Sequence, residues 1–421
     1  MPPHPEQLLQ RARELVPAIA DSAVEGERDR CVPPRIVAAL KEAGLFRALQ
    51  PQRWGGYELQ PTAVYDAEMA IGGADMSTAW IVGVLGIIPW SVALFDDRAG
   101  DEIWGTDPNS LICCAIRRAG TATPVAGGFR LSGQWGYASG CQHADWALLG
   151  AAAGTTPEDD YLMLVPKRDF AILDTWHVTG LKATGSHDVA VKDVFIPAHR
   201  ALRMVEIFDC KGPGQAVNTA ALYRMPFGLV FAGGVANASV GGLAGMLDRL
   251  LGEIRAQRGP RRPDPDLSFV VAEAATTIDE AKAVVTRNFA RLLAHAEARE
   301  LPPIEERLQV KYQLSLNTER CRIAANKLLE ASGASGLYTT RHPYGRIVAD
   351  ITAARQHITN SVPLHARDWG QVMLGQPRRH DFMLWKKEAY LFCSKNCWIS
   401  TSRTAFPPMT LSATFSSRSL R

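Results

Sequence analysis

The sequence of 421 residues lacks the cysteine pattern of a secreted, disulfide-stabilised protein. Its eight cysteines are scattered, and none forms a Cys-x-x-Cys pair. The N-terminal stretch MPPHPEQLLQRARELVPAIA also has no apolar core of the kind that a signal peptide requires. We therefore expect reduced thiols and a cytoplasmic location.

The chain also has little net charge. Its 46 basic residues against 43 acidic ones leave a formal charge of +3, which argues against nucleic acid as a partner. Two uncharged stretches, Met76–Phe95 and Phe227–Leu247, approach the ~20 residues that a bilayer span requires. The first contains Pro89 and is flanked by aspartates, and the second is rich in glycine. We expect buried helices and no membrane partner.

Nucleotide and metal motifs are missing as well. The sequence contains no Gly-x-Gly-x-x-Gly, and GLKATGSH (Gly180–His187) has Ser-His where a phosphate loop has Lys-Ser or Lys-Thr. The ten histidines include no His-Glu-x-x-His, and no Cys/His cluster has ligand spacing. We therefore predict no metal and no nucleotide triphosphate chemistry.

The pattern of apolar residues predicts helices first and strands second. Over residues 1–112 apolar residues recur at helical spacing. Over residues 113–212 the pattern changes to short strands, such as GGFRLSGQW, where Phe129, Leu131 and Trp135 alternate on one face. Several such strands at this spacing predict a small antiparallel barrel.

Helical spacing returns over residues 213–392. Leu267–Ala298 and Glu305–Ser332 are amphipathic, and the glycine-rich helix before them permits close helix packing. Residues 393–421 are rich in serine and threonine and are predicted to be a disordered tail. The fold class is therefore mainly helical α+β, with a helical domain, a central barrel and a C-terminal bundle.

Two glycine-serine turns in the strand region could bind a ligand. Ser139-Gly140 and Thr184-Gly185-Ser186 each end a strand segment and combine hydroxyls with exposed backbone amides. Such a rim can bond the polar edge of a planar ligand, while Trp135, Tyr137 and Trp146 supply flat apolar faces. The simpler interpretation of the spacing alone is that serine and glycine only form tight turns.

The same turns carry a family resemblance. GGFRLSGQWGYASGCQHADWALLGA and GLKATGSHDVAVKDVFIPAHRAL resemble segments of the flavin-dependent monooxygenases built on the acyl-CoA dehydrogenase fold. Three further segments match: VPPRIVAALKEAGLFRALQPQRWGGYEL, ADMSTAWIVGVLGIIPWSVALF and DITAARQHITNSVPLHARDWGQVMLGQP, so the resemblance covers about residues 25–377. It implies a helical domain, a β-barrel and a C-terminal four-helix bundle assembled as a homotetramer.

The resemblance also implies a cofactor and a reaction. Such oxygenase components take FMNH2 or FADH2 from a separate flavin reductase and, with O2, form a C4a-hydroperoxyflavin that hydroxylates an aromatic substrate. The implied flavin-binding residues are Trp135, Ser139, Gly140, Thr184, Gly185 and Ser186. Ser139 is also the implied catalytic hydroxyl near flavin N5 and C4a, a role that Ser186 fits equally well.

The substrate side of the site is implied less directly. His357 matches the late-helix histidine, and an imidazole with an ordinary pKa near ~6.5 is suited to accept a phenolic proton. His143 and Trp90 are candidate substrate-binding residues, whereas Trp80 is interpreted as core. The Arg258–Arg262 cluster is interpreted as a solvated loop.

Other activities are compatible with the same fold. One is N- or S-oxygenation of an amine, amino sugar or thiophene; another is an acyl-CoA dehydrogenase that oxidises a thioester; a third is a non-catalytic helical scaffold. The segment LGIIPW (Leu85–Trp90) is apolar where some relatives are expected to carry a histidine, and the tail after Gly375 resembles no part of the family. The sequence does not choose between FMN and FAD.

Overall fold

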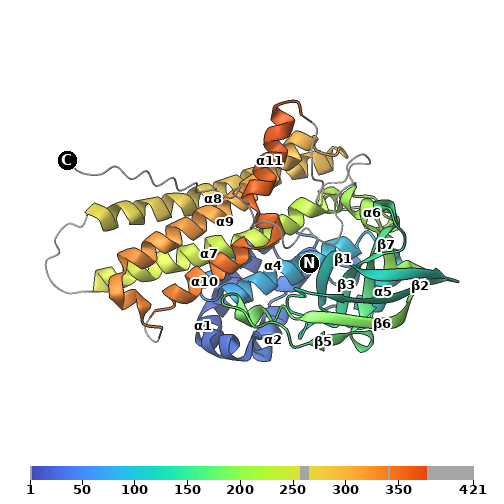
Figure 1. The fold of residues 1–421 in the computed structure, drawn as a ribbon, viewed down its shortest axis with the longest axis horizontal. Coiled ribbons are helices and arrows are strands. Elements are labelled where there is room, and N and C mark those ends of the chain that lie inside the picture. The colour runs from blue at the N-terminus through green and yellow to red at the C-terminus, as the bar shows by residue number, and fades with distance from the viewer. Residues whose placement is uncertain (1, 257–264, 340–341, 377–421) are drawn as a thin grey trace, which may run out of the picture.

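The computed structural model describes residues 2–256, 265–339 and 342–376 (Figure 1). Helices come first, as predicted for residues 1–112. The fourth helix is the most apolar, and all its residues are buried. Asp75 begins it by accepting a hydrogen bond from the Thr78 amide at 2.8 Å. The five helices are α1 (Pro5–Asp29), α2 (Pro34–Glu42), α3 (Pro61–Gly72), α4 (Met76–Val92) and α5 (Asp97–Trp104).

A seven-stranded sheet follows in the order β5-β6-β2-β1-β3-β4-β7. The expected alternation in β2 is confirmed, because Leu131 and Trp135 are buried while Arg130 and Ser132 are exposed. The strands are β1 (Ile112–Val125), β2 (Gly128–Trp135), β3 (Trp146–Ala152), β4 (Asp160–Pro166), β5 (Ala171–Leu173), β6 (Asp188–Pro197) and β7 (Ala201–Arg203).

The sheet corrects the prediction of an antiparallel barrel. Strands β1 and β3 pair in parallel, with Ile112 opposite Trp146, so the sheet is mixed. Its edge strands are β5 and β7, and no pairing joins them in the described part of the chain. The parallel pair exists because residues 136–145 carry the chain from the end of β2 across β1 to the start of β3. This crossing segment contains Ser139 and Gly140.

Long helices return after the sheet, as expected. α7 packs against α3 and α4 as well as against α8, α9 and α10, so it joins the first helical part to the last (Figure 1). Three long helices and three shorter ones form the C-terminal part that is described, and residues 377–392 of the predicted four-helix bundle lie outside it. The elements are α6 (Met204–Phe208), α7 (Phe227–Ala256), α8 (Pro265–Glu297), α9 (Ile304–Ala331), α10 (Tyr344–Arg355) and α11 (Val362–Met373).

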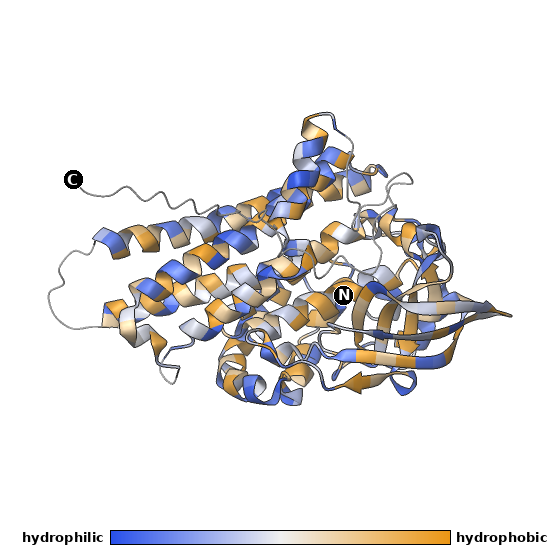
Figure 2. Ribbon diagram, viewed as in Figure 1, coloured by the Kyte–Doolittle hydropathy of each residue, from blue (hydrophilic) through white to orange (hydrophobic). Residues whose placement is uncertain are grey.

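Glycines allow α7 to approach its neighbours closely, which confirms the small-residue prediction. A Cβ on Gly73 would lie 3.0 Å from the Gly245 Cα atom, and one on Gly83 would lie 2.3 Å from the Gly234 carbonyl oxygen. Figure 2 shows α4 as largely hydrophobic, whereas α8 and α9 alternate along their length. The helices around α7 therefore form a layered core beside the sheet.

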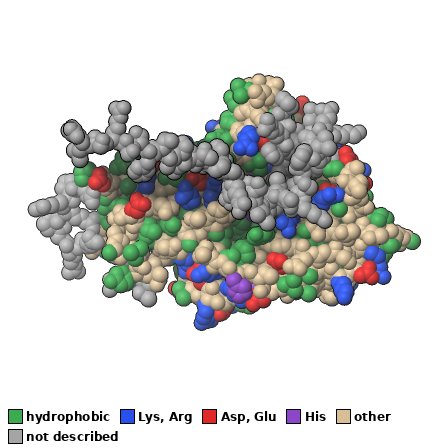
Figure 3. Space-filling model, in the orientation of Figure 1, with side chains coloured by type: hydrophobic (Ala, Val, Ile, Leu, Met, Phe, Trp, Pro, Cys, Tyr) green, Lys and Arg blue, Asp and Glu red, His purple; other side chains and the backbone are tan. Residues whose placement is uncertain are grey.

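Within the described residues, one helix is long and apolar enough to cross a membrane. It is α7, and 94% of its most apolar window is buried inside the protein. On the face drawn in Figure 3, basic and acidic side chains are interspersed among the described residues. The predicted disordered tail, 393–421, and the Arg258–Arg262 cluster lie outside the described residues.

Candidate active site

The two glycine-serine turns meet at one end of the sheet. The Gly140 amide donates to the Thr184 carbonyl oxygen at 2.8 Å, and the Ala138 amide donates to the His187 carbonyl oxygen at 3.1 Å. Glycine is required at both turns: Gly140 has a φ of 71° and Gly185 a φ of 53°. The expectation that these glycine amides face a ligand is wrong for Gly140, whose amide holds the two turns together.

The side chains of the two turns form one line of hydroxyl groups. Ser139 Oγ lies 2.7 Å from Ser186 Oγ, which lies 2.6 Å from Thr184 Oγ1. Thr184 in turn donates to the Leu181 carbonyl oxygen at 2.8 Å. All three hydroxyl residues are buried, with exposed fractions of 7%, 4% and 2% for Ser139, Ser186 and Thr184. We call this line, with the Leu181 carbonyl, the hydroxyl chain.

Trp80 connects the hydroxyl chain to the helices. Its indole Nε1–H donates to Ser139 Oγ at 3.1 Å, and its ring meets the His357 ring edge-on at a centroid distance of 5.8 Å. The Phe231 ring of α7 also lies near His357, at a centroid distance of 6.0 Å. The structure therefore brings together Ser139, Thr184, Ser186 and His357, which come from three separate parts of the sequence.

His357 begins a short turn before α11. Its Nδ1 accepts a hydrogen bond from the Thr359 amide at 3.3 Å and lies 2.7 Å from Thr359 Oγ1. His365 of α11 braces this turn through a contact of 3.2 Å between its Nε2 and the Ile358 carbonyl oxygen. Asn360 fixes it to α7 by donating to the Val235 carbonyl oxygen at 3.0 Å.

Burial changes the proton chemistry expected of His357. It lowers the pKa of the imidazole to about 4, because the charged form loses solvation. The sequence-based expectation assumed an ordinary pKa, and that assumption is wrong. At neutral pH the ring is uncharged and is better suited to hydrogen-bond a substrate hydroxyl than to hold its proton.

Two tryptophans proposed for the site lie instead in the core. The Trp135 indole donates to the Gly150 carbonyl oxygen at 2.6 Å, and its ring covers Gly120 and Gly133 inside the sheet. Trp90 donates to the Leu222 carbonyl oxygen and stacks on a phenylalanine of α7. Their exposed fractions are 1% and 0%. These positions correct the expectation that Trp135 lines the flavin and that Trp90 contacts the substrate.

His143 lies where the sheet meets the first helices. Its Nε2 is 3.3 Å from the Cys31 sulfur, in the segment between α1 and α2. Burial lowers its pKa to about 4 and raises that of the Cys31 thiol to about 11. Its contacts thus join the turn to the helices, and none that the structure gives it reaches the hydroxyl chain in the described residues.

Two aromatic groups border the turns, and sequence reasoning missed the role of one of them. Trp80 was assigned to the core, although a buried indole N–H needs an acceptor and here that acceptor is a catalytic candidate. Tyr137, which the sequence analysis gave as one of the apolar faces, is 59% exposed and has a φ of 68°, an uncommon value for a residue with a side chain. Its ring meets Trp176 edge-on at 6.0 Å.

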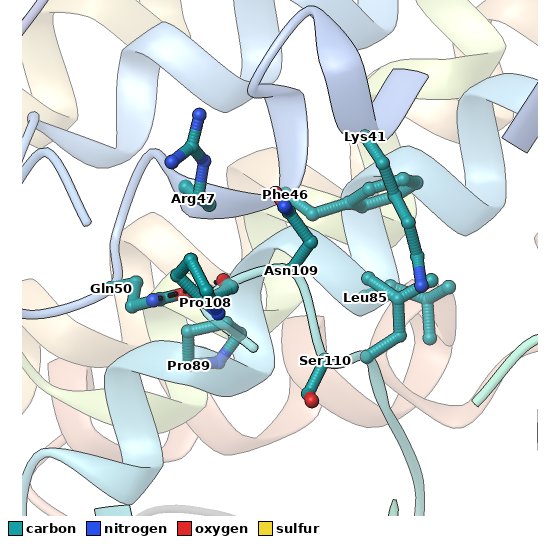
Figure 4. Close-up of a pocket in the computed structure, with 10 residues that line it drawn as sticks. Lys41, Phe46, Arg47, Gln50, Leu85, Pro89, Pro108, Asn109 and Ser110 are labelled. Atoms are coloured by element: carbon teal, nitrogen blue, oxygen red, sulfur yellow. Dashed lines mark hydrogen bonds between the residues drawn. The ribbon is translucent and has the colours of Figure 1, made fainter. Parts of the chain in front are cut away.

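A small cleft lies beside α4, lined by Leu85 and Pro89 among others (Figure 4). Lys41 of α2, Arg47 of the turn that follows α2, and Leu85 of α4 border it. Leu85 also packs on Gly140, where an added Cβ would lie 3.0 Å from its side chain. Leu85 is therefore the apolar wall between this cleft and the turn that carries Ser139.

Two other features lie outside the hydroxyl chain. A cavity of about 460 Å³ opens between α1, α3 and α7 and is bordered by Arg13, Asp248 and Arg249 among others. No group of three or more His, Cys, Asp or Glu side chains with the arrangement of a metal site occurs within residues 2–256, 265–339 and 342–376.

Comparison with known proteins identifies the fold. Residues 232–362 match the family described as acyl-CoA dehydrogenase, C-terminal domain. The crystal structure of 3-HSA hydroxylase from Rhodococcus sp. RHA1 superposes with a TM-score of 0.85 at 34% identity, covering 90% of this chain and 99% of that one. The molecule is thus an acyl-CoA dehydrogenase-like protein.

Curated relatives identify the family. The flavin-dependent monooxygenase oxygenase subunit HsaA of Rhodococcus jostii is 34% identical over 84% of this chain and 94% of its own length. The FADH2-dependent resorcinol hydroxylase oxygenase component of Rhizobium sp. is 31% identical over 88% and 94%. The chain belongs to the family of oxygenase components of flavin-dependent monooxygenases, as the resemblance predicted.

Proposed function

We propose that this protein hydroxylates a phenolic or polycyclic aromatic substrate with O2, using FMNH2 or FADH2 that a separate flavin reductase supplies. The observation that carries the proposal is the connection from the hydroxyl chain through Trp80 to His357. It unites a flavin-facing group and a substrate-facing group within one buried site. The relatives named for resorcinol and 3-HSA hydroxylation support an aromatic substrate.

The hydroxyl chain fits a reduced flavin. Ser139 and Ser186 are small, neutral and almost fully buried, so they can approach the flavin N5 edge without a charge. Neither hydroxyl has a proton that is lost near pH 7. A bound reduced flavin supplies the electrons that activate dioxygen.

The protein's own residues position the cofactor edge and exclude water. Ser139 is fixed by Trp80 on one side and Ser186 on the other, which holds its oxygen in one place. The fully buried helix α4 and Leu85 form an apolar wall behind that turn. Such exclusion limits the side reaction that releases hydrogen peroxide.

We infer that His357 hydrogen-bonds the substrate hydroxyl. Its Nδ1 accepts from the Thr359 amide, so in the neutral ring Nε2 carries the proton and is a donor. A donor there stabilises negative charge that develops on a phenolic oxygen. This role replaces the proton-accepting one that an ordinary pKa would have favoured.

An aromatic face for the flavin is also proposed. Tyr137 belongs to the same turn as Ser139, and its ring is accessible and supported by Trp176. We assign to Tyr137 the stacking role that the sequence gave to Trp135. Flat side chains with a polar group suit a ring system such as isoalloxazine.

Assembly and location remain part of the proposal. Exposed apolar side chains on the long helices, including Phe269 and Ile323, support burial against other copies in a homotetramer. The six cysteines in the described residues are unpaired, which supports a cytoplasmic location. We also retain the division into helical, sheet and bundle domains at about residues 1–112, 113–212 and 213–392.

A reconstituted assay tests the function. The purified chain is combined with a flavin reductase, NADH, FMN or FAD and a panel of phenols, and products are identified by mass spectrometry. The expected result is a product that gains one oxygen atom, with oxygen uptake that depends on the phenol. A chain that binds neither flavin would contradict the proposal, as would oxidised flavin that an acyl-CoA thioester reduces.

A further inference from the structure

Together with Trp80, the hydroxyl chain makes four hydrogen bonds, and four hydrogen atoms are available to make them. The contacts join Trp80 to Ser139, Ser139 to Ser186, Ser186 to Thr184, and Thr184 to the carbonyl oxygen of the residue three positions before it. One hydrogen comes from the indole, and each hydroxyl contributes one more.

Both ends of this chain are fixed in direction. The Trp80 indole nitrogen can only donate, and the Leu181 carbonyl oxygen can only accept. Thr184 must therefore donate to Leu181, Ser186 to Thr184, and Ser139 to Ser186. Only this arrangement places a hydrogen in every contact. If Ser186 turned toward Ser139, the two oxygens 2.6 Å apart would face each other without a hydrogen.

The accepting end is held firmly by the rest of the protein. The Leu181 amide donates to Asp350 of α10 at 2.6 Å, and the residue has a φ of 53°. The Trp176 indole also donates to the Leu181 carbonyl oxygen, at 3.0 Å. Asp350 is almost fully buried. The carbonyl that orients Thr184 is therefore part of the tertiary core.

We propose that Thr184 is a positioning residue that fixes the direction of the hydroxyl chain, so that Ser139 and Ser186 face the cofactor as acceptors only. Each of these serines has used its single hydrogen inside the chain and keeps one lone pair. The inference rests on the proposed function, because it takes the flavin N5 edge to lie against these oxygens.

The direction of the chain discriminates between flavin redox states. N5 of a reduced flavin carries a hydrogen and can donate to a serine oxygen, whereas N5 of an oxidised flavin is itself an acceptor. A rim of acceptors leaves the oxidised N5 without a partner. Because an unpaired buried polar atom is costly, the expected preference for reduced flavin from this contact is about tenfold.

The test compares Thr184→Val with Thr184→Ser in the full-length protein. Valine has the shape of threonine but cannot accept, so Ser186 is released to donate to Ser139 and Ser139 to donate to the ligand. The expected result is that Thr184→Val binds oxidised FMN about tenfold more tightly while its affinity for reduced FMN changes by less than about threefold. Thr184→Ser keeps the chain and the wild-type ratio of the two dissociation constants.

Both constants are measured by titration, in air for oxidised FMN and under anaerobic conditions for reduced FMN. An unchanged ratio in Thr184→Val overturns the inference, as does a gain in oxidised-flavin affinity that Thr184→Ser shares. A second variant, Ser139→Ala, distinguishes a failure of this inference from a failure of the proposed function. If it alters binding of neither redox state, the flavin does not lie on the hydroxyl chain, and the proposed site is wrong.

Discussion

On the sheet side of the site, Ser139, Thr184 and Ser186 bond to one another through short contacts that account for every hydroxyl hydrogen. On the bundle side, the His357 ring lies 5.8 Å from the Trp80 ring and 6.0 Å from the Phe231 ring, and its Nδ1 accepts from the Thr359 amide. The three hydroxyl groups of the first side do not titrate near neutral pH; the second side is a histidine whose pKa burial lowers to about 4.

This difference suggests that the two sides of the site have different roles. Hydroxyl groups keep the same charge at any ordinary pH, so they can hold a cofactor edge in a constant electrostatic environment. A neutral imidazole in an apolar surrounding responds strongly to charge that develops beside it, because the local dielectric is low. The sheet side is therefore suited to the cofactor and the bundle side to the substrate.

The largest expected effect comes from removing the imidazole. His357→Ala should lower the rate of hydroxylation by about 10²-fold, because the substrate hydroxyl loses its hydrogen-bond partner. Flavin affinity should change by less than about threefold, since His357 makes no bond to the hydroxyl chain. Product formation and flavin titration measure the two quantities. His4→Ala, at a side chain that is 70% exposed, is the control, and equal rates in both variants would contradict the assignment.

Acidic pH should lower the stability of the protein through a buried histidine on the bundle side, His365. Burial and nearby Lys311 lower the pKa of His365 to about 3, whereas the unfolded chain takes up that proton near ~6.5. Between these values the unfolded state binds more protons, so stability is lost as the pH falls. We expect a loss of roughly 2 kcal/mol at pH 5 relative to pH 8 from this residue.

Urea unfolding at pH 8 and pH 5 measures that loss. His365→Gln cannot titrate, so its free energy of unfolding should fall by roughly 2 kcal/mol less than that of the wild type over the same interval. Carboxylates and the other histidines contribute equally to both proteins and cancel in the difference. If the free energy of unfolding fell by the same amount in both proteins, protonation of His365 would not destabilise the fold, and the prediction would be wrong.

Removing one hydroxyl should have a smaller effect. Ser139→Ala interrupts the chain and takes away an acceptor at the cofactor edge. The fraction of NADH that is lost as hydrogen peroxide should rise by about tenfold, a factor that one hydrogen bond can supply. Ser132→Ala, at an exposed serine that bonds the Asp193 amide, is the matched control. Equal peroxide release from both variants would remove Ser139 from the proposed site.

The smallest effect is expected at Trp135, which the sequence analysis assigned to the flavin site and which the structure places in the core. Trp135→Phe loses the bond to the Gly150 carbonyl oxygen, so its stability should fall by about 1 kcal/mol while flavin affinity stays the same. Denaturant unfolding and flavin titration test this. If Trp135→Phe weakened flavin binding and left stability unchanged, Trp135 would be assigned to the cofactor site again.

The sequence predicted much of the sheet side and little of the bundle side. Ser139, Thr184 and Ser186 stand in glycine turns that local composition reveals, and their place at strand ends brings them together. His357 has no such signal, because it lies in a helical region with ordinary composition, and only the family resemblance selected it. His143 and Trp90 were misplaced because a histidine or tryptophan near a motif need not face the ligand.

The order of helices and strands, the apolar stripes of α8 and α9 and the glycine-serine turns follow from the sequence, since periodicity and turn chemistry act over a few neighbouring residues. The parallel pairing of β1 with β3, the contact of Trp80 with Ser139, the depressed pKa of His357 and the direction of the hydroxyl chain depend on groups that folding brings together from distant positions. Hydrogen bonding and desolvation depend on that arrangement in space, so only the tertiary structure decided them.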